Sequence, residues 1–373
     1  MPNAIDYLDW RGDIPLDFDG FNEVDGLIVS KLTSLDFTGI VPEDGSMRFA
    51  DALGEYFKRF GEEDRRLGVL LPAGTVTMAK KLLASRRFAG LVISDYVNHV
   101  DDAAAEQFCA LTALLPDGSR FAAFRGTDDT IAAWREDFNM SAEEAVPAQL
   151  DAAAYLEREL RAFDGTMRCG GHSKGGNLAV YAAMRAPEEL QERIGDVYNY
   201  DGPGFRVTMR GDPGYARVRS RIRTLIPQYA MVGVLLTNDA GYQIVESCET
   251  GVSAHNGFTW QVRGRRFVRC PGFALRSRVY AEAIRKWAEG LDFDERRRLI
   301  DAVFDALEST GARTLTELTE GKIRKALTAA RDLMSDGDER ALFTGSMELL
   351  ARSYLESARR ELPVIGRFRR KQD

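Results

Sequence analysis

The sequence is poor in the residues that hold metals and disulfides. Among its 373 residues there are only three histidines and four cysteines. The cysteines lie far apart, without the C-x-x-C spacing of zinc sites, at Cys109, Cys169, Cys248 and Cys270. This pattern indicates neither a zinc site nor a disulfide framework. We therefore expect a protein that uses no metal and no cofactor.

Long apolar runs and an excess of positive charge are also missing. No stretch approaches the roughly 20 consecutive apolar residues of a membrane span, and the first ten residues lack the basic and then apolar order of a secretion signal. The net charge of −7 argues against a nucleic-acid partner. The sequence therefore predicts a cytoplasmic, globular protein without a transmembrane segment.

The most informative segment is Gly171-His-Ser-Lys-Gly175, which has the G-x-S-x-G pattern of a nucleophile elbow. In such an elbow a strand turns sharply into a helix and lifts the serine, here Ser173, above the end of a parallel sheet. Glycines on either side are needed because strand and helix approach closely there. A strand over 166–170 and helical spacing up to Pro187 supply the flanking elements. The alternative is a glycine-rich turn in which Ser173 only caps the helix.

Strands and helices alternate through the middle of the chain, as in a protein whose sheet is covered on both faces. We expect an α/β-hydrolase fold with a mostly parallel sheet. Residues 1–105 are expected to form a helical or mixed segment packed on the core, 106–272 the hydrolase core, and 273–373 a helical region with a cap at Asp294. We expect the C-terminal helices to pack on the core or to form a homodimer contact. A third possibility is that they cover the site as a lid. The expected strands of the sheet are 107–115, 120–124, 166–170, 196–200, 223–226 and 242–246.

A serine nucleophile needs a base, and elbow-type hydrolases carry serine, acid and histidine in that order. His255 is the one histidine after Ser173, and it lies in a loop that follows a predicted strand. His172 should point away from Ser173 and have a structural role. His99 should precede the sheet as a surface or packing residue.

The sequence offers more than one acid to orient the histidine. Asp201 follows the strand after the elbow and is our first choice. Asp239 is the second candidate, although its turn-like surroundings explain an aspartate without catalysis. The more usual position, after the next strand, holds Gln228. A purely structural Asp201 would fix the glycine-rich turn that follows it.

An oxyanion hole requires hydrogen-bond donors close to the nucleophile. The strand that ends in Phe124-Arg-Gly-Thr127 can present the N–H and the hydroxyl of Thr127 to Ser173. The backbone N–H of Lys174 directly follows the nucleophile and is the second predicted donor. Trp134 and Asp137, on the helix that comes next, are expected to hold this loop.

These segments resemble the lipase class 3, or fungal lipase-like, branch of the α/β-hydrolases. The resemblance is closer to an uncharacterised bacterial lipase-like family and covers roughly residues 1–270. It implies carboxylic ester hydrolysis with Ser173 as nucleophile, His255 as base, and Thr127 with Lys174 as oxyanion donors. Class 3 lipases carry the acid after the strand that ends here at Ile226-Pro-Gln228, so the resemblance implies that the acid is displaced or absent in this chain. The resemblance also includes Phe21-Asn-Glu-Val-Asp-Gly26, Trp134-Arg-Glu-Asp-Phe-Asn139, Asp201-Gly-Pro-Gly-Phe205 and the segment from His255 to Trp260.

The sequence thus predicts a serine esterase or lipase-like hydrolase acting on a small-molecule or lipid-derived ester. A thioesterase or an acyltransferase would use the same acyl-enzyme on Ser173. An alternative from another class is a non-catalytic protein that keeps the hydrolase fold and uses its C-terminal helices for interaction.

Overall fold

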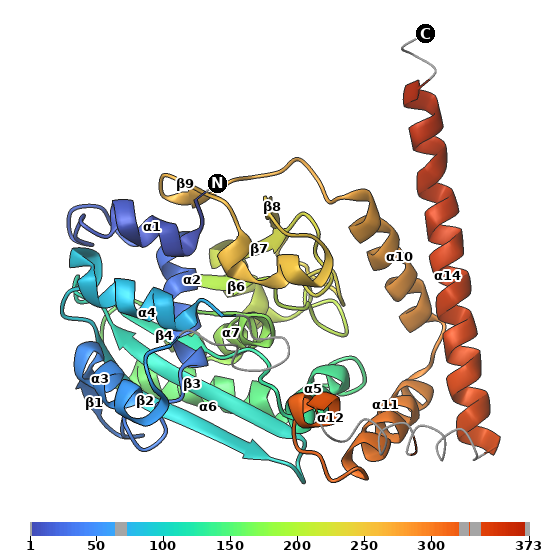
Figure 1. Cartoon of the computed structure of the whole chain (residues 1–373), viewed down its shortest axis with the longest axis horizontal. Helices are drawn as coiled ribbons and strands as arrows, with labels where there is room; N and C mark the ends of the chain where they lie inside the picture. Colours follow the sequence, from blue (N-terminus) through green and yellow to red (C-terminus); the bar gives the residue numbers. More distant parts are fainter. Residues whose placement is uncertain (1, 64–72, 321–327, 329–336, 370–373) are drawn as a thin grey trace.

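An eight-stranded sheet forms the centre of the computed structural model, which describes residues 2–63, 73–320, 328 and 337–369 (Figure 1). The strands lie side by side in sequence order. Strands β1 to β4 pair antiparallel and β4 to β8 pair in parallel. This is the predicted α/β class with a mostly parallel sheet. The strands are β1 (Ser46–Arg48), β2 (Val92–Asp101), β3 (Glu106–Leu114), β4 (Arg120–Phe124), β5 (Met167–His172), β6 (Ile194–Tyr200), β7 (Ile222–Pro227) and β8 (Gln243–Val245).

Helices cover both faces of the sheet because successive side chains of a strand point to opposite faces. On β4, Phe121 and Ala123 belong to one apolar core, while Ala122 and Phe124 belong to the other. The first core includes α1 (Ala4–Arg11), α2 (Glu23–Lys31), α3 (Phe49–Phe60) and α4 (Thr75–Ala84). The second core includes α6 (Pro147–Arg161), α7 (Lys174–Arg185), α8 (Glu188–Gln191) and α9 (Pro213–Val218).

The sheet begins earlier in the chain than residue 106, where we expected it to start. Strands β1 and β2 precede that residue, and β2 pairs with β3. The pairing shifts register between Ser94 and Val97, and Asp95 between them has a positive φ of 56°. Such a bulge breaks the strict alternation that marks a strand in the sequence, so the sequence pattern did not reveal β2.

His99 lies within β2 and not before the sheet, which corrects the expectation for this residue. Its Nε2 is 2.9 Å from Glu106 Oε1 and 3.2 Å from Asp151 Oδ2, and its side chain is 43% exposed. His99 was also expected to be a surface or packing residue, and this exposure agrees with a surface residue. In the described part of the chain these three side chains alone have the spacing of metal ligands. Exposed groups of this kind are common without a metal.

Helix α2 is fixed to the fold by the Phe21-Asn-Glu-Val-Asp-Gly26 segment. The Asn22 side chain accepts from the N–H groups of Val24 and Asp25, and Asp25 closes a capping box with the N–H of Asn22. Asp25 also accepts two hydrogen bonds from Arg87, at 2.6 and 2.8 Å, and both side chains are fully buried. This ion pair joins α2 to the chain that leads into β2.

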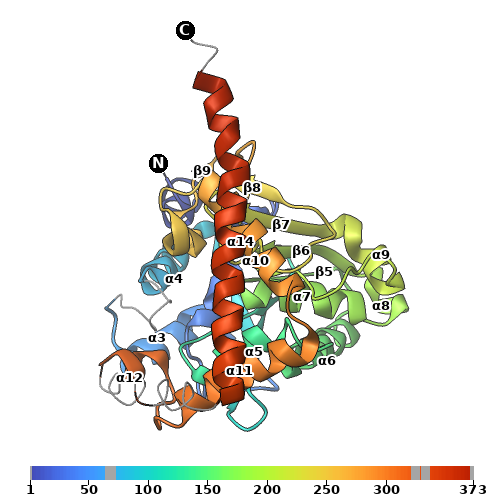
Figure 2. The same ribbon diagram turned by 90° about the vertical axis from the view of Figure 1, so that its right-hand side faces the viewer.

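The described C-terminal residues are mostly helical, as predicted. They form α10 (Leu275–Glu289), α11 (Phe293–Glu308), α12 (Leu315–Glu320) and α14 (Gly337–Arg369); residues 321–327, 329–336 and 370–373 lie outside the description. Helix α11 packs on α5 (Ile131–Asn139), and α14 runs alongside α10 (Figures 1 and 2). The cap of α11 is Asp292 and not Asp294, because Asp292 forms the capping box with Glu295. Among the described helices, none has both the length and the apolar character that a membrane crossing requires.

We predict that Asp25→Asn lowers the free energy of unfolding by about 3–5 kcal/mol, because the buried Arg87 guanidinium would lose its fully buried counter-charge and keep only Asp19, at 4.0 Å. Urea denaturation measures this loss. Asp51→Asn is the matched control, since Asp51 pairs with Arg48 at the surface with half of its side chain exposed and should cost less than about 1 kcal/mol. Equal losses for the two variants would contradict the role of the buried pair.

Candidate active site

Ser173 occupies the turn between β5 and α7 in a strained conformation. Its φ and ψ are 59° and −134°, a region that costs a non-glycine residue about 1–3 kcal/mol. A Cβ on Gly171 would lie 2.3 Å from the Gly175 carbonyl carbon, and one on Gly175 would lie 2.1 Å from the Phe124 carbonyl oxygen. The glycines are therefore required by the close approach of β4, β5 and α7. The Ser173 side chain makes no capping hydrogen bond to α7, which argues against the interpretation of this serine as a helix cap.

Asp201 and His255 are hydrogen-bonded to each other. Asp201 follows β6, the neighbour of β5, and its Oδ2 is 2.6 Å from His255 Nδ1. The N–H of Gly233 donates to the other carboxylate oxygen at 3.0 Å. Burial raises the pKa of Asp201, and these two hydrogen bonds oppose the rise by stabilising the carboxylate. Because Nδ1 is engaged by Asp201, the other ring nitrogen, Nε2, is left for a second partner.

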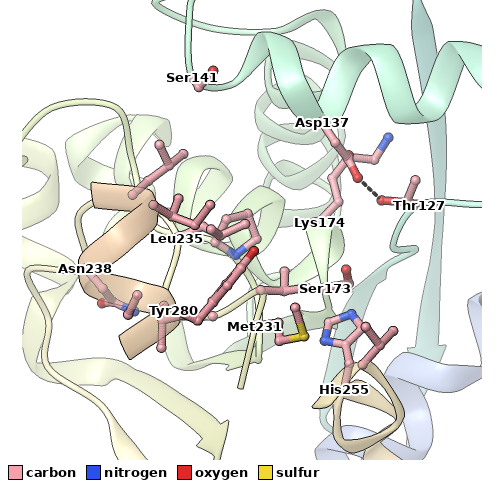
Figure 3. Close-up of a pocket in the computed structure, with 18 of the residues that line it drawn as sticks. Thr127, Asp137, Ser141, Ser173, Lys174, Met231, Leu235, Asn238, His255 and Tyr280 are labelled. Atoms are coloured by element: carbon pink, nitrogen blue, oxygen red, sulfur yellow. Dashed lines mark hydrogen bonds between the residues drawn. The ribbon is translucent and has the colours of Figure 1, made fainter. Parts of the chain in front are cut away.

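Ser173 and His255 line the same cavity, and Figure 3 shows the Ser173 hydroxyl beside the His255 ring. His255 ends the short 3-10 helix Gly251–His255, in the loop after β8. This is the loop in which the sequence predicts it. Three side chains from three separate segments thus meet at the carboxyl ends of neighbouring parallel strands, where open α/β sheets bind ligands.

The other candidate acids lie in different surroundings. Asp239 accepts hydrogen bonds from the Thr208 hydroxyl, the Met209 N–H and the Arg210 guanidinium. It fixes the chain that follows Asp201, as its turn-like sequence suggested. The Gln228 side chain is 2.8 Å from the Cys270 thiol sulfur. Of the three positions, Asp201 alone contacts His255.

His172 holds His255 from the opposite side. Its Nε2 is 2.6 Å from the backbone oxygen of His255, and the two ring centres are 4.5 Å apart. Burial, reinforced by the positive charges of Lys31 and His255, lowers the pKa of His172 well below its ordinary value. A neutral His172 can donate from Nε2 to the His255 carbonyl. The residue before the serine therefore positions the histidine, which is the structural role expected for it.

The loop of Thr127 lies against the elbow. A Cβ on Gly126 would come within 2.6 Å of the His172 carbonyl oxygen and 3.1 Å of Ser173 Cβ. The Thr127 hydroxyl donates to Asp137 on α5 (Figure 3). Burial raises the pKa of Asp137 to about 6, although the Lys174 charge and the Thr127 hydrogen bond act in the other direction. Asp137 thus fixes the Thr127 side chain at the cavity wall.

Lys174 turns its side chain away from the cavity centre and into the protein. Its Nζ is 2.8 Å from Glu136 Oε2 and donates to the Gln107 carbonyl at 3.0 Å. Both charged side chains are buried, and Glu136 also accepts from the N–H groups of Gln107 and Ala148. The buried pair fastens the start of α7 to α5 and β3. Only the backbone N–H of Lys174 remains as a donor next to Ser173.

The cavity that contains Ser173 has a volume of about 1620 Å³. The loop over residues 231–238 and helix α10 supply much of its apolar lining, and the described part of α14 contributes at the rim. These walls could not be predicted from the sequence, because their residues have no motif that marks a binding surface. The apolar side chains of the lining include Met231, Leu235, Val252, Tyr280, Ile284 and Trp287.

The mostly parallel central sheet with helices around it defines the α/β class of protein. The chain belongs to the Mbeg1-like family, whose model matches residues 82–305. Among solved structures it is similar to the one described as "Rhizomucor miehei lipase propeptide complex, native", with 15% identity over 62% of this chain and 79% of that chain and a TM-score of 0.36. No curated protein matches the sequence.

Lys31, the last residue of α2, is a buried cation at the edge of this cavity. It is 6% exposed, and its Nζ is 5.5 Å from the centre of the Phe258 ring. In the described ranges no carboxylate lies within ion-pair distance of it. Burial lowers the pKa of Lys31 from 10.5 to about 7. The unfolded chain therefore binds more protons than the folded one between pH 7 and pH 10, so Lys31 destabilises the fold most at pH 7 and below.

We predict that Lys31→Met raises the melting temperature by about 2 °C or more at pH 7, and that the gain shrinks as the pH approaches 10. Calorimetry at pH 7, 8.5 and 10 measures both effects. Lys58→Met, at an exposed position paired with Glu55, should show no comparable change with pH. A lower melting temperature for Lys31→Met at pH 7 would contradict the prediction.

Proposed function

We propose that this protein is a serine hydrolase that cleaves carboxylic esters through an acyl-enzyme on Ser173. The observation that carries the proposal is the hydrogen bond between Asp201 and His255, with the His255 ring beside a serine in elbow geometry. A serine hydroxyl is a weak nucleophile unless a base accepts its proton. His255 has the free nitrogen and the oriented ring that this requires.

In this mechanism Ser173 Oγ attacks the ester carbonyl carbon while His255 Nε2 takes the hydroxyl proton. The resulting tetrahedral oxyanion collapses, the bond to the alcohol oxygen breaks, and the proton on His255 passes to the departing alcohol. A water molecule then attacks the acyl-enzyme, again with His255 as base, and releases the acid. Asp201 keeps Nδ1 protonated and stabilises the imidazolium that forms in each half-reaction.

The oxyanion is stabilised by the backbone N–H groups of Lys174 and Thr127, while the Thr127 hydroxyl donates its one proton to Asp137 and so fixes the loop that carries the Thr127 N–H. Donors that are fixed before the reaction stabilise developing charge without having to reorganise. Two buried acids support this fixation here, since Asp137 holds the Thr127 hydroxyl and Glu136 holds the Lys174 side chain. The apolar lining of the cavity supports a lipid-derived acyl group as the part of the substrate that is buried.

Thioester cleavage and acyl transfer would proceed through the same acyl-enzyme and differ only in the leaving group or the acceptor. The non-catalytic alternative is less consistent with the site. A strained Ser173 and a fully buried Asp201 carboxylate both cost stability. A protein that only presents an interaction surface gains nothing from keeping them together beside a cavity.

We predict that Ser173→Ala and His255→Ala each lower kcat by about 10⁴-fold or more, and that Asp201→Asn does so by about 10⁴-fold. A series of p-nitrophenyl esters of increasing acyl length, together with labelling by a fluorophosphonate, measures these losses. Asp239→Asn is the matched control and should retain activity. If wild type is not labelled, or if Ser173→Ala turns over esters as wild type does, the proposal fails.

We predict that Thr127→Val lowers kcat by about 10²-fold with little change in KM, because loss of the hydroxyl bond to Asp137 frees the loop whose Thr127 N–H acts on the oxyanion and not on the ground-state ester. Thr127→Ser keeps the hydroxyl and should restore most of the rate. Steady-state kinetics on the preferred ester separate the two parameters. An effect confined to KM would assign Thr127 to substrate binding and contradict the prediction.

A further inference from the structure

Most basic side chains around the cavity are neutralised by nearby acids. Carboxylates within 4.0 Å leave these cations little charge to offer a ligand. The neutralised pairs are Arg125 with Asp128, Lys174 with Glu136, Arg278 with Glu361, Arg285 with Glu282 and Glu289, and Arg360 with Glu282.

Two other arginines of the cavity wall, Arg206 and Arg296, have no such partner among the described residues. Arg206 follows directly on Phe205, which exchanges two backbone hydrogen bonds of 2.8 Å with Thr237. Arg296 lies in the second turn of α11. Both guanidinium groups contact the ring of Phe293, with their central carbons 4.3 and 4.8 Å from the ring centre. One aromatic side chain thus gathers two unneutralised positive charges at the same cavity wall.

The charges of these two arginines are incompletely satisfied. Burial and the nearby charge of Arg206 lower the pKa of Arg296, and the Asp292 carboxylate opposes this shift only in part. Arg296 donates to the backbone oxygens of Ser141 and Asp292, which carry no full negative charge. The Nε of Arg206 is buried and has no hydrogen-bond acceptor in the described part of the chain. Contact with a ring contributes about 0.5–2 kcal/mol but occupies none of the in-plane N–H donors.

We propose that Arg206 and Arg296 bind a phosphate group carried by the ester substrate. Two guanidinium groups match the charge of a phosphate monoester and can each donate two parallel hydrogen bonds to its oxygens. That the phosphate belongs to an ester substrate rests on the proposed hydrolase function. That a phosphate binds here rests on the two arginines alone. It divides the cavity into an apolar region for an acyl chain and a cationic wall for a phosphate.

The position of this wall fits an ester whose phosphate lies at a distance from the scissile bond. Ser141, whose carbonyl accepts from Arg296, lies across the drawn cavity from His255 and Ser173 (Figure 3). A substrate with its carbonyl at Ser173 can therefore extend its phosphate toward α11. Such a phosphate belongs either to a lipid headgroup or to a soluble carrier, and the two sources share the chemistry recognised here.

Two matched pairs of octanoyl substrates test the proposal. The lipid pair is 1-octanoylglycerol 3-phosphate and 1-octanoylglycerol, and the soluble pair is octanoyl-coenzyme A and S-octanoyl-N-acetylcysteamine. Wild type should favour the phosphate-bearing member of one pair by about tenfold or more in kcat/KM, and that pair identifies the source. Arg206→Gln and Arg296→Gln should each reduce this preference by about tenfold. A preference near unity in both pairs, or one unchanged in both variants, would overturn the proposal.

Arg297→Gln is the matched control, because Arg297 is exposed on the same helix and does not line the cavity. It should leave the preference unchanged. Binding is measured separately by calorimetry on Ser173→Ala with the non-hydrolysable 1-O-octylglycerol 3-phosphate and with coenzyme A. If no ester is cleaved but one of these ligands binds and Arg206→Gln weakens its binding, the hydrolase proposal fails and the phosphate site stands. If esters are cleaved and neither ligand binds, the phosphate site fails alone.

Discussion

The close approach of helix α7 to the ends of β4 and β5 is the constraint on which the rest of the site depends. Three backbone segments meet where Gly126, Gly171 and Gly175 leave no space for a Cβ. This contact forces Ser173 into its strained conformation and brings the Thr127 loop against it. The order of the strands places Asp201 near Ser173, because β6 lies beside β5 and both residues follow their strands at the same edge of the sheet. The chemistry is therefore set by backbone packing before any polar side chain is added.

The two neighbours of Ser173 extend this constraint to opposite sides of the cavity. His172 holds the carbonyl of His255, and Lys174 is bound to Glu136 on the helix that also carries Asp137. A change in the backbone at Ser173 would therefore displace both His255 and the helix that holds the Thr127 side chain. This connection explains why the three polar residues His172, Ser173 and Lys174 are found at a tightly packed position. The side chains of His172 and Lys174 are both hydrogen-bonded, and these bonds compensate for their removal from water.

The sequence was most informative where a function imposes a local pattern. Glycine spacing predicted the sharp turn at Ser173, and the scarcity of histidine left His255 as the one candidate base after it. Asp201 could be ranked above Asp239 but not proven, because the choice depends on a contact between residues 54 positions apart. Strand β2 was missed because its bulge at Asp95 interrupts the alternation. The sequence marked the segment 21–26 only by its resemblance to a family. Its helix capping and its ion pair with Arg87 are contacts that only the structure shows.

The cavity walls and the reacting groups come from separate parts of the chain. Thr127, Ser173, Asp201 and His255 all precede residue 273, whereas α10, α11 and α14 close much of the cavity around them. Substitutions in these helices can reshape the space for a substrate without touching the strained turn or the buried acid. The shape of the cavity can therefore change through the C-terminal helices while the arrangement of Ser173, Asp201 and His255 stays as it is.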